Sequence, residues 1–223
     1  MRIFIINPDY GMTREDMDSR CAMLQPYVGA GTTLHMECLT ETKVEIDSAA
    51  DVVLAGPEIL AMAERAERDG YDAVVLYCFS DPAAEACRER LHIPVVGGAA
   101  AACAVAPILG RRGGVIVTNA ARIPEKIHFL HDRGLPPAFL GAVEAAELAA
   151  PIWEDRAGAL QAVIRCGEAM KKAHHIDVLL LGCLSFLGLA GPAEEALSIP
   201  VIDPAVSAVM LAEDLARRRL CQL

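Results

Sequence analysis

The sequence predicts an α/β protein made of two pseudo-symmetric lobes, each a mostly parallel sheet flanked by helices. Apolar, β-branched runs alternate with helix-like segments along nearly all of the 223 residues, which is the pattern of a parallel sheet. These runs lack polar alternation, as expected where helices cover both faces of a sheet. In addition, the segment 72–95 is loosely repeated at 177–201. The repeat indicates that half of the fold is duplicated.

Each copy of the repeat contains the same three landmarks in the same order. An Asp is followed by an apolar stretch that ends in Cys-x-Ser, and a helix-like segment then leads to Ile-Pro-Val. Asp72 precedes Cys78 by six positions, and Asp177 precedes Cys183 by the same number. One cysteine in each copy predicts a thiol on each side of a shared cleft, and we expect the active site in that cleft.

Eight segments are predicted strands. The chain opens with a short apolar run before Asn7-Pro8, which is interpreted as the first strand rather than a signal peptide. In chain order, the expected strands are Ile3–Ile6, Leu34–Leu39, Ala73–Tyr77, Val95–Val96, Val115–Thr118, Phe139–Val143, Val178–Leu181 and Val201–Ile202.

The helices between these strands have recognisable ends. Thr13 precedes acidic residues and is an expected N-cap, while Gly70 closes the helix that leads into the first cysteine strand. After Cys78, Asp81 is expected as the N-cap and Pro82 as the first helical residue.

The repeat also predicts the domain boundaries. Residues 1–97 would form lobe one and residues 98–203 lobe two, with the C-terminal helix 204–223 packing back on lobe one. No low-complexity linker occurs, so the boundary is expected at a crossover of the chain rather than at a tether.

Charge and hydropathy limit the possible partners. The formal net charge is −10 and the pI is near 5.0, which argues against a nucleic-acid surface, because phosphates require clustered Lys and Arg. No stretch approaches the roughly 18 uncharged apolar residues of a membrane span. We therefore expect a cytoplasmic protein without a nucleic-acid or membrane partner. A small-molecule substrate and a homo-oligomer are also expected.

Eight cysteines are scattered through the chain without a CxxC motif. Their spacing and the chain length favour reduced thiols, most of them buried as small hydrophobic side chains. The adjacent His174 and His175 have no partner at a metal-ligand spacing, so no metal is expected.

Cys78 and Cys183 lie where parallel sheets bind ligands, outside the carboxyl ends of strands. A thiol that also precedes a helix has a lowered pKa, although Leu184–Gly191 intervenes before the helix after Cys183. Two such thiols suit proton transfer at a carbon acid, because one thiolate removes a proton while the other thiol supplies one to the opposite face. Outside this duplicated context, each would be interpreted as an ordinary buried cysteine.

The carbanion formed by such a reaction needs hydrogen-bond donors near its carbonyl oxygen. Ser80 and Ser185, together with the amides beside them, are expected to serve, and Phe79 and Leu184 are expected to contact the substrate. This chemistry requires no cofactor.

Several motifs are shared with a known family. They are Ile6-Asn7-Pro8, Cys78-Phe79-Ser80-Asp81-Pro82, Ile93-Pro94-Val95-Val96-Gly97, Val117-Thr118, Leu181-Gly182-Cys183 and Pro200-Val201-Ile202-Asp203. In these motifs, and over essentially its whole length, the chain resembles the aspartate/glutamate racemase superfamily and within it the hydantoin and allantoin racemase branch. The resemblance implies a two-lobed α/β fold and a cofactor-independent mechanism in which Cys78 and Cys183 are the acid/base pair. It also implies that Asn7 and Thr118 line the pocket.

Two stretches depart from the usual pattern of that branch. Asp9-Tyr10-Gly11 stands where another Asn and small polar residues are usual, and Leu184-Ser185-Phe186 stands where small residues follow the second cysteine. Both changes affect the pocket, so the sequence defines the acid/base chemistry better than the substrate.

Three functions follow from these patterns. The leading hypothesis is a racemase of a 5-substituted hydantoin or a similar carbonyl-activated stereocentre. The second is another reaction of the same superfamily, either maleate-type cis/trans isomerisation by a covalent thiolate or arylmalonate-type decarboxylation, against which the presence of Cys78 counts. The third is a non-catalytic two-lobed protein that binds a small ligand.

Three residues also have structural interpretations. Asn7 before Pro8 can form a turn instead of binding substrate. Thr118 can be an ordinary strand-end residue, and Asp81 can be an N-cap rather than a substrate contact.

Overall fold

The computed structural model describes residues 1–221 and divides into two compact units. Unit 1 contains Met1–Gly98 together with the C-terminal segment from Ala205, and unit 2 contains Ala99–Pro204. The chain therefore leaves unit 1 once and returns to it with its last helix.

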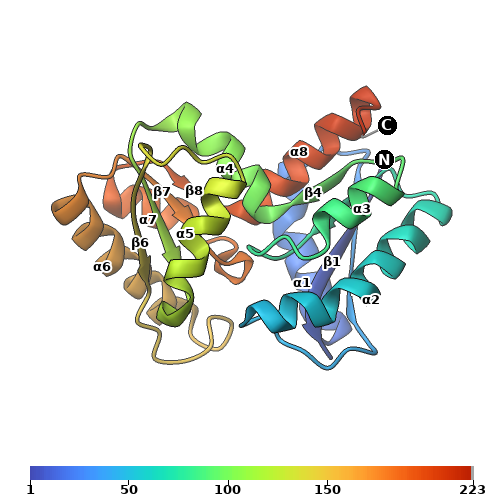
Figure 1. Ribbon diagram of the computed structural model, residues 1–223, viewed down its shortest axis with the longest axis horizontal. Helices are drawn as coiled ribbons and strands as arrows, with labels where there is room; N and C mark the ends of the chain where they lie inside the picture. The colour runs from blue at the N-terminus through green and yellow to red at the C-terminus, as the bar shows by residue number, and fades with distance from the viewer. Residues whose placement is uncertain (222–223) are drawn as a thin grey trace. The chain divides into compact units, whose positions relative to one another are not determined.

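Unit 1 is a four-stranded parallel sheet with helices on both faces. Its elements are β1 (Arg2–Tyr10), α1 (Arg14–Leu24), the 3₁₀ turn η1 (Gln25–Tyr27), β2 (Thr33–Leu39), α2 (Ala49–Arg68), β3 (Ala73–Leu76), α3 (Ala84–Arg90), β4 (Val95–Gly97) and α8 (Pro204–Arg218). Figure 1 shows α2 and α3 on one side of this sheet and α1 on the other.

Unit 2 repeats this plan. Its elements are α4 (Gly98–Leu109), β5 (Gly113–Val117), the 3₁₀ turn η2 (Ala120–Arg122), α5 (Ile123–Asp132), β6 (Leu140–Ala145), α6 (Arg156–His174), β7 (Val178–Leu181), the 3₁₀ turn η3 (Leu184–Phe186), α7 (Ala190–Leu197) and β8 (Val201–Ile202). Helices α6 and α7 lie on one side of the sheet and α5 on the other (Figure 1).

The two sheets have the same strand order. Unit 1 runs β2-β1-β3-β4 and unit 2 runs β6-β5-β7-β8, and every neighbouring pair is parallel. The predicted α/β architecture with two parallel sheets is therefore confirmed. The cysteine strand of each repeat, β3 or β7, occupies the same interior position in its sheet, so the sequence repeat is also a structural one.

The duplicated aspartates have a structural role at the amino ends of the strands. A carboxylate oxygen of Asp72 accepts the backbone amide of Arg2 at 2.7 Å, and Asp177 accepts the amide of Arg112 at 2.8 Å. Each aspartate thus holds the start of the strand, β1 or β5, that pairs with its own cysteine strand. Because strands β3 and β7 run away from this edge, the aspartates lie at the opposite end of the sheet from the cysteines.

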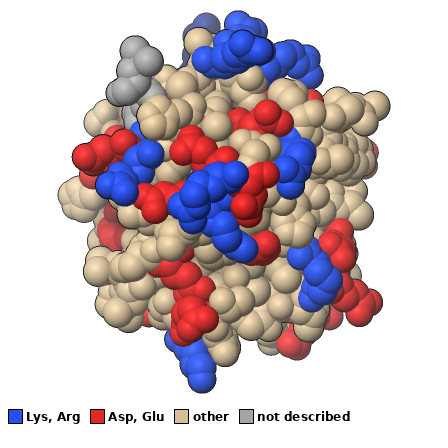
Figure 2. Space-filling model, turned by 90° about the vertical axis from the view of Figure 1, so that its right-hand side faces the viewer, with Lys and Arg blue, Asp and Glu red and all other residues tan. Residues whose placement is uncertain are grey.

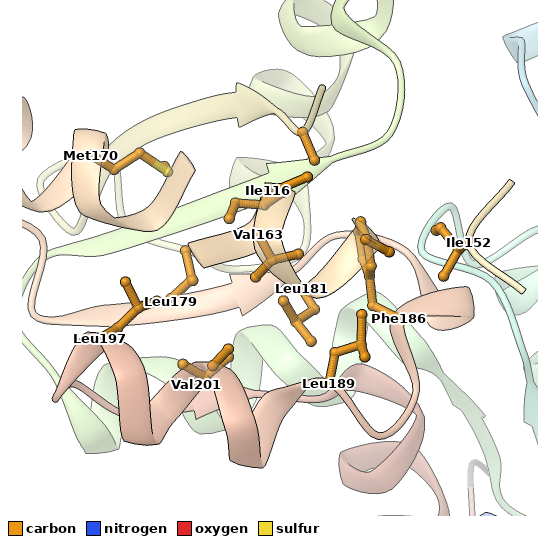
Figure 3. Packing of buried hydrophobic residues seen from close by; sticks show 14 of the residues in the cluster. Ile116, Ile152, Val163, Met170, Leu179, Leu181, Phe186, Leu189, Leu197 and Val201 are labelled. Carbon is orange, nitrogen blue, oxygen red and sulfur yellow. The ribbon is translucent and has the colours of Figure 1, made fainter. Parts of the chain in front are cut away.

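Each sheet has its own apolar core against one layer of helices. In unit 1, Phe4, Ile6, Val74 and Leu76 face Ile59 and other buried residues of α2. In unit 2, alternate strand residues meet the small and branched side chains of α6 and α7, as Figure 3 shows for Ile116, Leu179, Leu181, Val163 and Leu197. Parallel strands covered on both faces account for the continuous apolar runs in the sequence.

Helix α8 is fixed to unit 1 by a buried acid. The carboxylate of Glu213 accepts the hydroxyl of Thr32 at 2.5 Å and the amide of Gly29 at 3.0 Å, and it lies 3.3 Å from a guanidinium nitrogen of Arg217. Although burial opposes it, these donors hold the pKa of Glu213 below its usual value.

The surface carries both signs of charge. On the face drawn in Figure 2, acidic and basic side chains adjoin in several places, among residues of other kinds that cover most of the area. Ion pairs such as Arg90 with Glu64, at 3.0 Å, are exposed and contribute little to stability. Within residues 1–221, none of the helices has both the length and the apolarity needed to cross a membrane.

Candidate active site

In unit 1, two candidate residues lie at the carboxyl ends of adjacent strands. Ile6 of β1 pairs with Leu76 of β3, and Tyr77 donates its amide to the carbonyl of Ile6 at 2.8 Å. Asn7 directly follows Ile6 in the chain, and Cys78 lies two residues beyond Leu76, the last residue of β3. The strand order reverses between β1 and β3, and the carboxyl edge at such a switch point is where open α/β sheets bind ligands.

Cys78 begins a tight turn that leads to α3. Its carbonyl accepts the amide of Asp81 at 3.3 Å, and its sulfur accepts the amide of Ser80 at 3.4 Å. The thiol is partly exposed, whereas Phe79 and Ser80 are buried. This N–H group is a donor that a thiolate at Cys78 could use, because a hydrogen bond to a charged form stabilises that form.

The predicted role of Asp81 as a helix N-cap is wrong. Helix α3 begins at Ala84, and its N-cap is Ala83 in the left-handed region without a side-chain hydrogen bond. Asp81 itself has a φ of +43°, and its buried carboxyl group lies against the backbone of Gly97 at the end of β4, where a Cβ would come within 2.2 Å of Asp81 Cγ. Since Cys78 precedes this short helix by six residues, the expected influence of a helix dipole on its thiol is replaced by that of the turn.

Asn7 lies within β1, which is longer than predicted and extends to Tyr10 with an irregular register after Asn7. Its side-chain oxygen accepts the amide of Asp9 at 3.1 Å, which is the local bond expected where Asn7 shapes the backbone. The remaining group, the side-chain NH₂, is the donor that Asn7 can offer a ligand. Burial, and then the charge of Glu45, raise the pKa of Asp9 beside it.

In unit 2, Thr118 and Cys183 occupy the matching strand ends. Ile116 of β5 pairs with Leu181 of β7, and Gly182 donates its amide to the carbonyl of Ile116 at 2.6 Å. The approach is so close that a Cβ at Gly182 would lie 2.6 Å from that carbonyl oxygen. A glycine is therefore required immediately before Cys183. Thr118 follows β5 and is exposed.

The residues after Cys183 form the 3₁₀ turn η3 rather than a direct start of a helix. Leu184 is buried and Ser185 is partly exposed, as is Cys183 itself. Phe186 is fully buried and packs with Leu189 and Leu181 in the core of unit 2 (Figure 3). The bulky residues that depart from the family pattern thus fix the turn to the core.

The sequence-predicted residues therefore fall into two matched sets. Unit 1 brings Asn7, Cys78, Phe79 and Ser80 to the carboxyl edge of its sheet, and unit 2 brings Thr118, Cys183, Leu184 and Ser185 to the carboxyl edge of its own. Each set offers a thiol, a hydroxyl and backbone amides, which are the groups needed for proton transfer and for stabilising an enolate oxygen.

A family model described as Asp/Glu/hydantoin racemase matches residues 3–212. The chain belongs to the Asp/Glu/hydantoin racemase family. This membership confirms the resemblance inferred from the motifs around the two cysteines, and it makes the protein an enzyme of the racemase and isomerase class.

Curated relatives match the chain over nearly its whole length. It is 32% identical over 219 residues to a hydantoin racemase of Rhizobium meliloti, covering 96% of this chain and 88% of the relative. It is 29% identical over 217 residues to a hydantoin racemase of Paenarthrobacter aurescens, covering 96% and 91%.

Solved structures show the same fold. An allantoin racemase from Klebsiella pneumoniae superposes with a TM-score of 0.89 at 28% identity, covering 100% of this chain and 90% of that one. Unliganded arylmalonate decarboxylase reaches a TM-score of 0.68 at 17% identity, over 96% and 92% of the two chains. At that identity the likeness concerns the fold alone.

Three of the other cysteines are structural thiols rather than proton-transfer groups. All eight cysteines are free thiols. Burial raises the pKa of Cys21, Cys87 and Cys166 to about 11. These three thiols are therefore protonated at neutral pH, as expected for structural cysteines. Among the described residues, no group of three or more His, Cys, Asp or Glu side chains could hold a metal ion.

Sequence reasoning missed two residues that shape the turn after Cys183. Asp203, two residues after the second copy of the repeat, accepts the amide of Gly188 at 3.0 Å, and Arg156 donates to backbone carbonyls of the same turn. Asp203 stands at the position of Gly97 in the first copy, and this difference within the repeat was a signal. No feature of the sequence pointed to Arg156, because it binds backbone carbonyls, which every residue carries.

Proposed function

We propose that this enzyme is a cofactor-independent racemase of a hydantoin-type substrate, with Cys78 and Cys183 as its acid/base pair. The observation that carries the proposal is the matched placement of the two cysteines. Each follows the same interior strand of two sheets that have the same order, and each is partly exposed at a carboxyl edge.

The relatives support the choice of substrate class. The names of the similar proteins are hydantoin racemase and allantoin racemase, and allantoin is itself a hydantoin with a substituent on carbon 5. The hydrogen on that carbon is acidic because the adjacent carbonyl group accepts the charge when the proton leaves. A thiolate is a suitable base for such a hydrogen at neutral pH.

The reaction proceeds in two proton transfers. One cysteine, as thiolate, takes the proton from carbon 5, and the electron pair of the broken C–H bond passes to the carbonyl oxygen as an enolate. The other cysteine, as thiol, then gives a proton to the opposite face of the same carbon, and the electron pair returns to form the new C–H bond. The first cysteine ends as thiol and the second as thiolate, so the reverse reaction uses them in exchanged roles.

The groups beside the thiols stabilise the enolate and orient the ring. Ser80 and Ser185 supply hydroxyl groups and neighbouring amides for the enolate oxygen. Asn7 supplies its NH₂ group, since its oxygen is used by Asp9, and Thr118 supplies an exposed hydroxyl. Phe79 and Leu184 provide apolar contacts. These side chains complete the chemistry without a cofactor.

The cellular setting follows from the thiols. An enzyme that depends on two reduced cysteines fits the cytoplasm, where thiols are kept reduced. The expected homo-oligomer stays a prediction, which sedimentation of the purified protein would test.

A hydrogen-exchange screen tests the proposal. The purified enzyme is incubated in deuterated water with single enantiomers of 5-substituted hydantoins, allantoin, aspartate and glutamate, and with maleate. We expect the carbon-5 proton signal of a hydantoin to disappear while optical rotation falls to zero. Conversion of maleate to fumarate with a covalent adduct on Cys78 would instead identify the cis/trans isomerase. Binding of a hydantoin without exchange would indicate a ligand-binding protein and overturn the proposal.

A further inference from the structure

The turn that follows Cys183 lacks two internal hydrogen bonds. Its own amides satisfy the carbonyls of Cys183, Leu184 and Phe186, which accept from Phe186, Leu187 and Leu189 at 2.9 to 3.2 Å. The carbonyls of Ser185 and Leu187 do not take part in this ladder. A backbone carbonyl in a tight turn needs a partner from elsewhere.

One side chain supplies both missing partners. Arg156 donates from one terminal nitrogen of its guanidinium to the carbonyl of Ser185 at 2.9 Å and from the other to the carbonyl of Leu187. The guanidinium is planar and carries its donors at fixed angles. The two bonds together therefore fix both the position and the orientation of the turn relative to Arg156.

Arg156 is itself held in a defined place. It is the first residue of α6, whose N-cap Asp155 accepts the amide of Gly158 at 2.8 Å. Its guanidinium carbon lies 4.5 Å from the centre of the Trp153 ring, in the range of a cation–π contact. An arginine with its backbone capped and its head group stacked loses little freedom when it binds the turn.

Two other anchors hold the turn at residues that follow the Cys-x-Ser motif. Asp203 binds the amide of Gly188 at the far end of the turn, and the Phe186 ring is buried in the core. The bond from Arg156 to Ser185 acts directly on the backbone of the Cys-x-Ser motif. In unit 1, by contrast, the sulfur of Cys78 binds the Ser80 amide within its own turn.

We propose that Arg156 is a positioning residue, which fixes Cys183 and Ser185 for proton transfer by holding the carbonyls of Ser185 and Leu187. The inference rests on the proposed function, in which Cys183 is one of the two bases. A displacement of about 1 Å at a reacting group lowers the rate by a factor on the order of 100. Loss of the guanidinium should therefore reduce kcat much more than it changes KM.

The test compares two arginines of unit 2 that both bind backbone carbonyls. Arg156→Gln removes the bonds to the turn, and Arg156→Lys keeps the charge but has a single donor nitrogen in place of two. Arg112→Gln is the matched control, because Arg112 donates to the carbonyl of His174 at 2.6 Å at the other end of α6. Each variant is assayed for kcat and KM on the hydantoin that the wild-type enzyme racemises, with concentrations corrected for folded protein by near-ultraviolet circular dichroism.

The expected result is a drop in kcat by about 10- to 100-fold in Arg156→Gln, partial recovery in Arg156→Lys, and a kcat within about twofold of wild type in Arg112→Gln. Deuterium exchange of each pure enantiomer gives a sharper measure. Arg156→Gln should slow exchange mainly for the enantiomer whose exchange Cys183→Ser slows. Equal slowing of both enantiomers, or a wild-type kcat in Arg156→Gln, would overturn the inference.

A chemical measurement separates this inference from the proposed function. The rates at which iodoacetamide alkylates Cys183 and Cys78 are followed by mass spectrometry in the same molecule. Release of the turn should make Cys183 react at least about threefold faster relative to Cys78 in Arg156→Gln, with no such change in Arg112→Gln. This result does not depend on turnover. An inactive wild-type enzyme would reject the proposed function, whereas an unchanged alkylation ratio would reject the role of Arg156.

Discussion

The backbone amide of Ser80 donates a hydrogen bond to the sulfur of Cys78 at a distance of 3.4 Å. The bond closes within three residues, so it is built into the Cys-x-Ser motif itself. It gives the sulfur a partner that stabilises negative charge, which is what a cysteine needs in order to act as a base. The same motif recurs at Cys183, where Arg156 and Asp203 bind the turn.

Thiol reactivity should follow the environment of each sulfur. At pH 8, with Cys221→Ser removing the exposed thiol near the end of the chain, Cys78 should be alkylated fastest. Cys21, Cys87 and Cys166 should react slowest, because burial raises the pKa of each to about 11 and leaves on the order of one thiolate in a thousand. Peptide mass spectrometry over a time course measures the order. Fast labelling of Cys87 would contradict it.

Gly182→Ala should damage the site while leaving the unit folded. A Cβ at this position would lie 2.6 Å from the backbone oxygen of Ile116, and neither strand can move without breaking the sheet. We expect a loss of about 1 to 3 kcal/mol in the free energy of unfolding and a fall in racemase rate of at least about tenfold. Urea denaturation and polarimetry measure the two effects.

Gly191→Ala is the matched control for that substitution. Gly191 lies in α7, in the same unit, and nothing lies within 4 Å of the position of its Cβ. Alanine in a helix is favoured over glycine by up to about 1 kcal/mol, so this variant should be as stable as the wild type or more stable. A similar loss in both variants would mean that the close strand contact at Gly182 is not the cause.

Asp9→Asn should stabilise the protein, and the gain should depend on pH. Burial and the charge of Glu45 raise the pKa of Asp9 in the folded state, so the folded protein binds this proton more tightly than the unfolded chain does. The wild type therefore loses stability as the pH rises from the ordinary Asp value of about 3.9 through the raised folded value. Asparagine removes that loss. The Tm difference between variant and wild type should be near zero at pH 3.5 and positive at pH 8. A constant difference would contradict the assignment.

Glu213→Gln should remove an acid-sensitive attachment of α8. Although burial opposes ionisation, the hydrogen bonds from Thr32 and Gly29 and the charge of Arg217 lower the pKa of Glu213. The stabilisation is thus present above the usual Glu value of about 4.3 and is lost as the pH falls through the lower folded value. At pH 7 the variant should lose about 1 to 3 kcal/mol.

Asp214→Asn serves as the comparison for Glu213→Gln. Asp214 is the next residue of α8 and forms an exposed ion pair with Arg218 at 3.0 Å, which contributes little. At pH 7 the urea midpoint of Glu213→Gln should therefore lie below that of Asp214→Asn, and at pH 3.5 the two midpoints should be similar. Equal midpoints at pH 7 would show that Glu213 does not hold the helix.

Much of the fold could be predicted because the repeat and the apolar runs report burial directly. Strands β7 and β8 have the predicted bounds, and the shared Asp-to-Cys spacing placed each cysteine just beyond an interior strand. The length of β1 could not be predicted, because Pro8 interrupts the pattern although the strand continues past it with an irregular register.

The turns after the cysteines were harder to predict, since their geometry depends on contacts across the sheet. Asp81-Pro82 has the composition of a helix start, yet the Asp81 carboxyl group lies against Gly97 and the helix begins later. In unit 2 the arrangement is exchanged. The carboxylate of Asp203 comes from the strand end and a glycine, Gly188, stands in the turn. In both copies an aspartate carboxyl group meets a glycine, but the aspartate lies in the turn in one copy and at the strand end in the other. A linear repeat does not reveal this exchange.

In the proposed mechanism the two cysteines are separate bases, one for each enantiomer. The most direct test is proton NMR in deuterated water on each pure enantiomer of a 5-substituted hydantoin with Cys78→Ser and with Cys183→Ser. Each variant should lose racemisation by at least about 1,000-fold, and each should retain deuterium exchange for one enantiomer only, opposite in the two variants. Racemisation at the wild-type rate in either variant would contradict the two-cysteine mechanism.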